Sequence, residues 1–265
     1  MTAIPYLTRL WSPVEGCTPV SAGCDNCWAR AYLHRWGRPT VPVVKRHKID
    51  DPVRWRKPQT IGVGFTGDLF HKEVDDMFIR AVLLQALSAP RHRFIFLTKR
   101  PERMDRIMFN LDSVARADNV WLGVSVEDQA TADARIPILL DTECRHRWVS
   151  LEPQLGPVDL SGYLPTFGRV AHEPFGRGDW VVQGCESGPK RRPFDTDWAR
   201  VVRDQCAAAE VPYYLKQMPT PGCQKHDDDC PFGPCDETCE ERRPQFTKSP
   251  MLDGCRHLEL PWRAP

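Results

Sequence analysis

The middle of the chain alternates short runs rich in β-branched and aromatic residues with stretches of helical periodicity. The predicted strands are 7–14, 61–70, 93–100, 120–126, 146–153, 179–187 and 212–218. Helical stretches follow several of them, such as 74–88 and the segment that begins at Pro101, a residue type favoured at a helix's first position. Another predicted helix is capped by Asp195 and places Trp198, Val201, Val202 and Cys206 on one face. Repeated strand–helix units build parallel sheets. About seven units predict an α/β fold, a full or partial parallel (β/α) barrel of the TIM type, in preference to an open sheet.

Polar residues stand at the C-terminal ends of six predicted strands. They are Thr66 and Asp68, Thr98 and Lys99, Ser125 and Glu127, Ser150 and Glu152, Glu186 and Ser187, and Lys216 and Gln217. In a parallel barrel these strand ends converge on one face, where active sites are built. The pattern therefore predicts a site at that face, to which most of the strands contribute.

Bulk composition narrows the classes of function. A chain of 265 residues can bury a sizeable core as one large domain or two small ones. Its net charge of +1 argues against binding nucleic acid by overall charge, so any such contact must be local. The N-terminal run lacks a secretory signal, and no segment approaches the roughly 20 apolar residues that span a bilayer. We expect a soluble, cytoplasmic protein without a membrane partner.

Eleven cysteines are many for such a chain, and they are unevenly distributed. Cys17, Cys24 and Cys27 form a first cluster, whereas Cys144, Cys185 and Cys206 stand alone in the middle. A second cluster comprises Cys223, Cys230, Cys235, Cys239 and Cys255. In a reducing cytosol, clustered thiols bind metals more often than they form disulfides. The distribution predicts two metal sites.

The first cluster favours an iron–sulfur centre over its alternatives. Disulfides are the weakest interpretation, because three is an odd number of thiols. A zinc knuckle needs a fourth ligand, but His34 stands seven residues after Cys27, roughly 10 Å away by helix rise. Three thiolates fit a 4Fe-4S cluster that leaves one iron open to bind a small molecule.

The position of these cysteines, in a loop after the first strand of a parallel array, resembles the radical S-adenosylmethionine (SAM) enzymes. In those enzymes the open iron chelates the amino and carboxylate groups of SAM, and the usual spacing is C-x3-C-x2-C. This chain has C-x6-C-x2-C. Longer strings, including "GCTPVSAGCDNCWA", "LTKRPERM", "SLEPQLGPVDL" and "LDGC", resemble a phage and prophage family with a three-cysteine motif. The likeness runs over about 7–218 and 252–261, and "LTK" and "VSVEDQ" are similar to spore photoproduct lyase-like enzymes.

The resemblance implies a radical SAM-like barrel over 1–218 and assigns roles at the strand ends. Cys17, Cys24 and Cys27 would hold the 4Fe-4S cluster, and SAM would contact Asp68, Glu152 and Glu186. Lys99, Glu152, Cys185 and Glu186 are the candidate catalytic residues, and Arg100 would contact a carboxylate or phosphate of the substrate. The alternative is charge pairing across the barrel mouth, which is favoured for Asp68 and Lys216. Cys185, in "GCESG" where "GGESG" is expected, would donate a hydrogen atom or a thiolate, although a buried cysteine is usually a small hydrophobic residue.

Residues 219–265 form a predicted second unit, a Cys-rich acidic extension with a returning C-terminal tail. Its 223–241 stretch has seven acidic residues against one lysine and no hydrophobic period, so something other than a core must order it. Cys223, Cys230, Cys235 and Cys239, with Cys255 beyond, predict zinc or an auxiliary iron–sulfur cluster. A mobile tail with free thiols is the alternative.

A basic segment, 30–57, follows the first cluster. It holds nine Lys and Arg residues against two Asp, and Trp36 and Trp55 lie among them. We expect Lys45 and Arg46 to hold phosphates while a tryptophan stacks on a base. The alternative is a solvated face with tryptophans packed on the barrel.

Together these features favour an enzyme over a non-catalytic protein. The leading hypothesis is an iron–sulfur, radical SAM-like protein that cleaves SAM reductively to modify or repair a nucleic acid or nucleotide. It would need an electron donor protein, and a partner encoded nearby is a further expectation. The alternative is a non-catalytic phage binding module stabilised by zinc or an iron–sulfur cluster.

Overall fold

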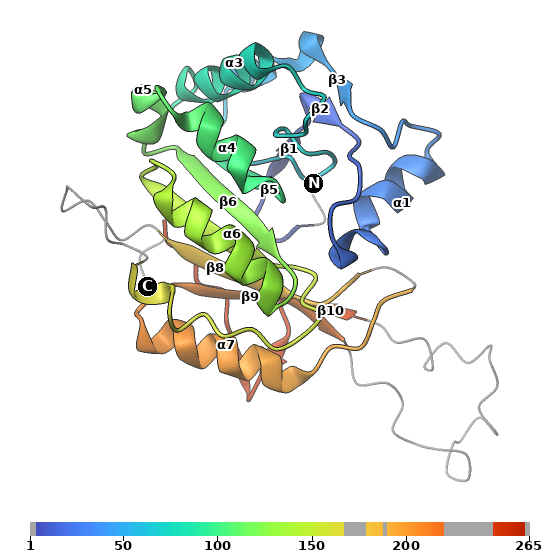
Figure 1. Ribbon diagram of the computed structural model, residues 1–265, viewed down its shortest axis with the longest axis vertical. Helices are drawn as coiled ribbons and strands as arrows, with labels where there is room; N and C mark the ends of the chain where they lie inside the picture. Colours follow the sequence, from blue (N-terminus) through green and yellow to red (C-terminus); the bar gives the residue numbers. More distant parts are fainter. Residues whose placement is uncertain (1–3, 167–178, 188–189, 220–245, 263–265) are drawn as a thin grey trace.

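A single curled sheet organises the computed structural model, which describes residues 4–166, 179–187, 190–219 and 246–262 (Figure 1). Its eight strands are, in spatial order, β1 (Arg9–Trp11), β4 (Thr60–Val63), β5 (Arg93–Thr98), β6 (Val120–Val126), β7 (His146–Leu151), β8 (Trp180–Gly184), β9 (Tyr213–Pro219) and β10 (Phe246–Lys248). The first seven are mutually parallel, and β10 pairs antiparallel with β9. Within the described residues the sheet ends at β1 and β10, which confirms the partial form of the predicted barrel.

The connections supply the remaining elements. The longer helices are α1 (Trp28–Arg35), α3 (Asp76–Leu87), α4 (Pro101–Met108), α6 (Gln129–Asp141) and α7 (Thr196–Ala208). The short ones are α2 (Asp51–Arg54), α5 (Asp112–Ala115), η1 (Ala22–Cys24), η2 (Arg46–Lys48) and η3 (Leu164–Thr166). Two small antiparallel pairs are β2 (Val14–Glu15) with β3 (Val43–Val44) and β11 (Met251–Leu252) with β12 (Cys255–Arg256). Helices α4, α6 and α7 lie along one side of the sheet (Figure 1).

Three of the longer helices begin at a capping side chain. The Asp75 carboxylate accepts a hydrogen bond from the Phe78 amide at 3.0 Å and caps α3. Asp128 and Thr131 form a reciprocal capping box at the start of α6. Asp195 caps α7, as the sequence predicts. Each cap satisfies amides that have no partner inside the helix, and so fixes where the helix leaves the strand end.

The buried face of α7 differs in part from the expected one. Val202 and Cys206 are buried, but Val201 is exposed and Ala199 takes its place against the sheet. The buried face therefore consists of Ala199, Val202 and Cys206, which follow one another at spacings of three and four residues.

Aromatic side chains fill the concave face of the sheet toward the N-terminal ends of the strands. Tyr6 packs edge to face against Trp148 and Trp180, whose own rings are tilted by 31°, and the three centroid separations are 5.0–6.4 Å. The indole N–H of Trp148 donates to the Phe96 carbonyl at 2.8 Å. This aromatic floor fills the part of the concave face that lies below the C-terminal strand ends.

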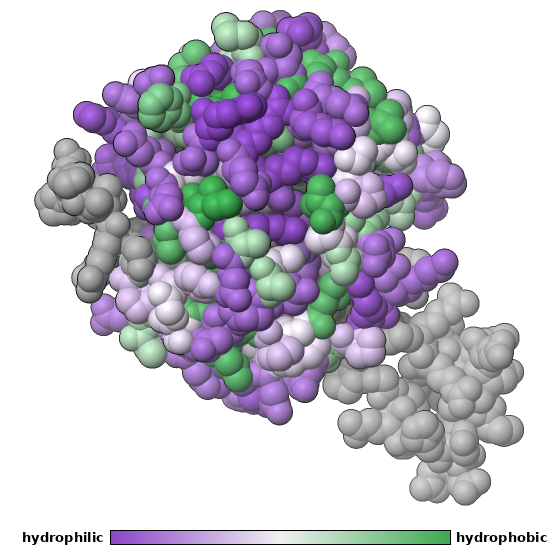
Figure 2. All heavy atoms as spheres, viewed as in Figure 1, coloured by the Kyte–Doolittle hydropathy of each residue, from purple (hydrophilic) through white to green (hydrophobic). Residues whose placement is uncertain are grey.

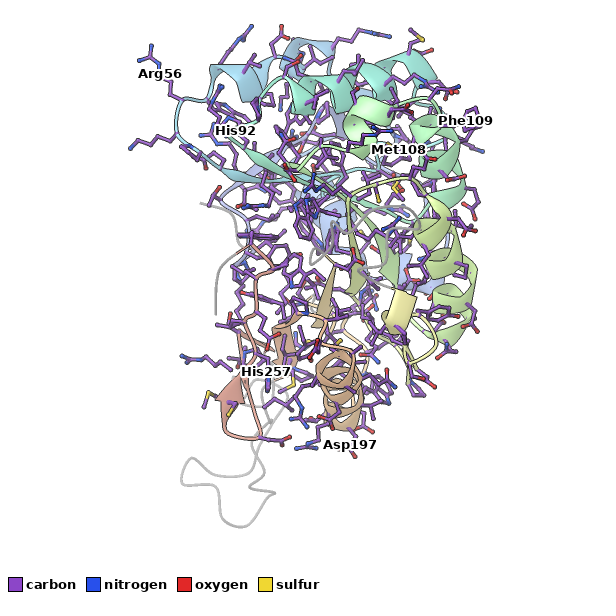
Figure 3. All side chains as sticks on the ribbon, turned by 90° about the vertical axis from the view of Figure 1, so that its left-hand side faces the viewer. Arg56, His92, Met108, Phe109, Asp197 and His257 are labelled. Carbon is purple, nitrogen blue, oxygen red and sulfur yellow. The ribbon has the colours of Figure 1, made fainter. Side chains whose placement is uncertain are left out.

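The C-terminal segment returns along β9 and covers the open side of the floor. The Leu215 amide donates to the His257 carbonyl at 2.8 Å, and the Trp180 indole donates to the Glu259 carbonyl at 2.9 Å. His257 lies on this segment, at the same end of the molecule as Asp197 of α7 (Figure 3). The predicted boundary between 218 and 219 stays a prediction, and 220–245 lie outside the described residues.

The outer surface in the view of Figure 2 is mostly hydrophilic, with scattered hydrophobic spots. Every helix in the described part of the chain is too short or too polar to cross a membrane.

We expect Gly123→Ala to destabilise the protein, because the added methyl carbon would stand 2.1 Å from Trp148 Nε1 in the aromatic floor. Overpacking of this kind costs about 1–3 kcal/mol or more in free energy of unfolding. Urea denaturation followed by tryptophan fluorescence measures it. Gly162→Ala is the control, because no described atom lies within 4 Å of its new methyl group; equal stability of the two variants would contradict the packing described.

Candidate functional site

The C-terminal ends of the parallel strands surround a cavity of about 150 Å³. Eleven of the twelve polar residues predicted to converge there line it, the exception being Glu127. Side chains from β4 through to β9 therefore meet at one place, as parallel strands with a common direction require.

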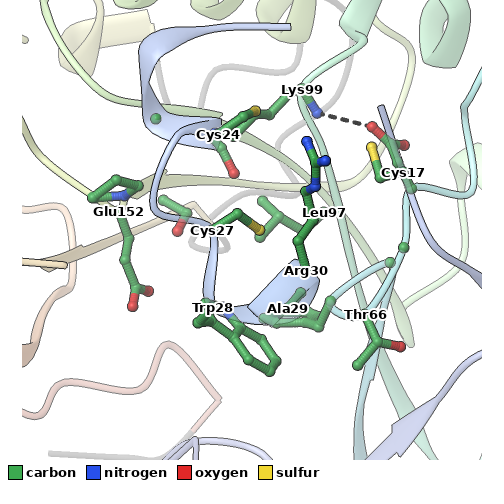
Figure 4. Close-up of a pocket in the computed structure, with 18 of the residues that line it drawn as sticks. Cys17, Cys24, Cys27, Trp28, Ala29, Arg30, Thr66, Leu97, Lys99 and Glu152 are labelled. Atoms are coloured by element: carbon green, nitrogen blue, oxygen red, sulfur yellow. Dashed lines mark hydrogen bonds between the residues drawn. The ribbon is translucent and has the colours of Figure 1, made fainter. Parts of the chain in front are cut away.

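The three cysteines of the first cluster line the same cavity (Figure 4). Cys17 follows β2, Cys24 is the last residue of η1, and Cys27 occupies the N-cap position of α1. Gly16 precedes Cys17 with φ of +80°, and a side chain there would put its first carbon 2.0 Å from the Val41 carbonyl oxygen. All three thiols are partly exposed to the cavity. Among the described residues, no group of three or more Cys, His, Asp or Glu side chains lies close enough together to hold a metal ion.

Two cations contact two of these thiols. Arg100 donates to Cys17 Sγ at 3.3 Å, and Lys99 donates to Cys24 Sγ at 3.6 Å. Burial and nearby Asp68 raise the pKa of Cys17, and Arg100 offsets this only in part. Burial also raises the pKa of Cys24. Lys99 and hydrogen bonds from the loop of Cys24 lower this pKa by more than burial raises it, so the net shift is downward. Positive charge beside a thiol favours its thiolate, the form that ligates metals.

Asp68 positions Arg100. One of its carboxylate oxygens accepts from the Thr98 hydroxyl at 2.7 Å, and the other pairs with Arg100 at 2.6 Å. Arg100 also donates to the Thr18 carbonyl at 2.9 Å. Asp68 is thus engaged in the charge pairing that the sequence favours for it, and its contact with SAM stays a prediction.

Sequence reasoning expected Glu127 at this face but gave it no role. It is fully buried and pairs with both Lys99 and Arg135, the latter at 2.9 Å. The Ser21 hydroxyl donates to it at 2.8 Å. Gly23 packs against it so closely that a methyl carbon there would lie 2.4 Å from the Glu127 side chain. Glu127 therefore holds both the cysteine loop and the lysine that contacts Cys24.

Glu186 makes a second tie to the same loop. Its carboxylate accepts from the Arg192 amide at 2.7 Å and from the Asn26 side chain at 3.2 Å, and it forms an ion pair with the Arg192 guanidinium. Burial raises its pKa, but the hydrogen bonds from Arg192 lower it more, so the carboxylate stays ionised. The predicted catalytic and SAM-binding roles of Glu186 stay predictions.

Glu152 and Cys185 lie at the part of the cavity formed by β7 and β8. Glu152 pairs with Lys216, which is the charge pairing expected for that lysine. Cys185 is buried, and burial together with Glu152 raises its pKa to about 12. Its thiol therefore keeps its proton at neutral pH. Figure 4 shows Glu152 set apart from the Cys24 and Lys99 side of the cavity.

Of the residues predicted to bind substrate, Arg100 lines the cavity and the other four do not. Lys45 pairs with buried Glu15, and the Arg46 guanidinium lies 5.2 Å above the Phe78 ring. Trp55 packs under Arg9 at 4.4 Å. These contacts match the alternative of packing against the barrel, while exposed Trp36 is the next residue after α1.

Four residues of α1 that sequence reasoning did not assign line the cavity. They are Trp28, Ala29, Arg30 and Leu33, the first three of which are labelled in Figure 4. The start of their helix directly after Cys27 was the available signal.

The second cysteine cluster falls almost wholly outside the described residues. Cys223, Cys230, Cys235 and Cys239 belong to 220–245, and Cys255 is exposed on β12. Their metal site stays a prediction.

Residues 1–261 match the model of a family described as "Protein of unknown function (DUF5131)". The chain belongs to this family. The family model does not bear on the resemblance to a phage family with a three-cysteine motif, which stays a prediction. No curated protein matches the chain.

Among solved structures, the chain is similar to spore photoproduct lyase. A double mutant with bound AdoMet and dinucleoside spore photoproduct is 12% identical, with a TM-score of 0.40, and the match covers 80% of this chain and 65% of that one. Another mutant gives a TM-score of 0.39 at 12% identity, covering 82% and 66%. The enzyme complexed with dinucleoside spore photoproduct gives 0.38, with the same identity and coverage. The chain thus spans about two thirds of these proteins' length, and similarity of this size says nothing about chemistry.

We expect Glu127→Gln to destabilise the protein by about 3–5 kcal/mol, because it removes one partner from two buried ion pairs and leaves Arg135 uncompensated. Chemical denaturation measures the change in free energy of unfolding. Asp204→Asn is the matched control, since Asp204 pairs with Arg203 at an exposed position, where ion pairs contribute below about 1 kcal/mol. A loss at Glu127 no greater than at Asp204 would contradict the role given to this carboxylate.

Proposed function

We propose that this protein is an iron–sulfur, radical SAM-like enzyme that modifies or repairs a nucleic acid or nucleotide. The observation that carries the proposal is the meeting of three cysteine thiols, drawn from one loop, with the polar ends of the parallel strands in a single cavity. A site of this kind brings a metal-binding group and candidate substrate-binding residues together.

The residues present fit a thiolate-ligated cluster. Cys17, Cys24 and Cys27 would hold it, and all three thiols face the cavity with part of their surface exposed. Lys99 and Arg100 already contact two of the sulfurs, and hydrogen bonds and charges around cluster sulfurs tune reduction potentials. Bound there, a reduced 4Fe-4S cluster would supply one electron for the reductive cleavage of SAM.

The chain's own residues do the remaining work. Lys99 and Arg100, each held by a buried carboxylate, keep positive charge fixed beside the thiolates without needing to reorganise. Glu152, at the opposite part of the cavity, has an oxygen available to accept a hydrogen bond beside its pair with Lys216. Cys185 keeps a protonated thiol at the cavity wall, the form able to give up a hydrogen atom. The aromatic floor excludes water from below.

The prediction is that anaerobically reconstituted protein carries iron and sulfide at the first cluster and makes 5′-deoxyadenosine from SAM under dithionite. Replacing Cys17, Cys24 and Cys27 together by Ala removes about four iron atoms and four sulfides per chain, whatever the second cluster holds. Metal and sulfide analysis measures the loading, and chromatography measures the nucleoside.

Cys144→Ala is the matched control, since Cys144 is buried away from the cavity and should leave the iron content unchanged. Zinc without sulfide at the first cluster would reject the proposal in favour of a metal-stabilised binding module. A full cluster with no 5′-deoxyadenosine would reject the SAM chemistry while keeping the iron–sulfur site.

A further inference from the structure

Helix α1 carries a stripe of exposed aromatic side chains. Trp28, Tyr32 and Trp36 recur every four residues, and their exposed fractions are 38%, 42% and 64%. Apolar residues of a surface helix normally face the core. In α1, Ala29 and Leu33 occupy that face and are buried. The aromatic stripe is therefore a second apolar surface, which the other described residues leave open.

The stripe starts at the candidate site. Trp28 lines the cavity, whereas Tyr32 and Trp36 lie one and two turns farther along. Because an α-helix rises 1.5 Å per residue, the stripe extends about 12 Å from the cavity rim. Figure 1 shows α1 at the edge of the molecule, away from the helices that cover the other face of the sheet.

The charge around the stripe is positive. Helix α1 contains Arg30 and Arg35 and no acidic residue. The Arg35 guanidinium lies 6.0 Å from the centre of the Trp36 ring, which keeps a cation next to the aromatic surface. A partner with planar faces and negative charge suits this combination better than a purely apolar one does.

Arg30 differs from the other cations of the cavity. Lys99 and Arg100 are each paired with a carboxylate, but the side chain of Arg30 makes no hydrogen bond or ion pair with another described residue. Its guanidinium is therefore open to a ligand anion, and guanidinium groups bind phosphate well because they can donate two parallel hydrogen bonds.

We propose that α1 binds a single-stranded nucleic acid, with bases stacked on Trp28, Tyr32 and Trp36 and a phosphate held by Arg30 at the cavity. A single strand is favoured over a duplex because its base faces are free to stack on side chains. The choice of ligand rests on the proposed function, although binding itself needs neither the cluster nor SAM.

The test is fluorescence anisotropy of a short fluorescein-labelled oligothymidylate with the full chain, in the absence of SAM and reductant. Tyr32→Ala and Trp36→Ala should each weaken binding roughly 5- to 150-fold, and Trp36→Phe should restore most of it. Arg30→Gln should reduce the slope of log affinity against log salt concentration by about 0.7, as loss of one phosphate contact to a single strand does.

Phe109→Ala is the matched control, because Phe109 is 72% exposed but lies at the end of α4, outside the cavity lining (Figure 3). Circular dichroism checks that each variant is folded. Unchanged affinity in the stripe variants, an equal loss in Phe109→Ala, or equal affinity for the matching duplex would overturn the proposal. If the protein cleaves SAM but does not bind the oligonucleotide, only the proposed nucleic-acid binding by α1 is wrong. If it binds the oligonucleotide but does not cleave SAM, binding by α1 is supported and the proposed SAM cleavage is wrong.

Discussion

The arrangement at the cavity depends on the buried carboxylate of Glu127. A charge removed from water is tolerated only when it is paired and hydrogen-bonded, and Glu127 meets this condition through Lys99, Arg135 and the hydroxyl of Ser21. Its three partners come from a strand end, a helix and the cysteine loop. Removing the carboxylate would therefore affect all three elements together, and the position of Lys99 beside Cys24 is a consequence of this network.

A second carboxylate, Asp68, repeats the arrangement two strands away in the sheet, after β4. Asp68 fixes Arg100, which contacts Cys17, much as Glu127 fixes Lys99, which contacts Cys24. Each cation is thus held between an acid of the sheet and a sulfur of the loop. Fixed cations at both thiols lower the cost of gathering several thiolates in a small volume, where their mutual repulsion would otherwise be large. Glu186, which follows β8, also anchors the loop through Asn26 and Arg192.

Local sequence was sufficient for most of the scaffold, although the run predicted as a strand over 61–70 is a strand only as far as Val63. Strand β6 covers the residues predicted, and Asp195 caps α7, because hydrophobic runs and capping side chains act within a few residues. Convergence of the strand-end polar residues also followed from sequence, since parallel strands share a direction. The hydrogen bonds across the site could not be predicted, because they join residues far apart in the sequence. Glu127 is 106 positions from Ser21, and Glu186 is 160 positions from Asn26. The aromatic floor and the exposed side of Val201 likewise depend on packing between distant elements.

The aromatic floor also determines where a ligand can enter. Gly123 provides the space that Trp148 needs, and Trp148 and Trp180 then close the lower half of the partial barrel. The cysteine loop and the start of α1 line the cavity, so Trp28 and the three thiols face the same space. A free nucleotide would be small enough to use this space alone, whereas the stripe beyond it extends past the cavity by about two helical turns. The length of the aromatic surface therefore favours a polymer over a mononucleotide as the ligand of this site.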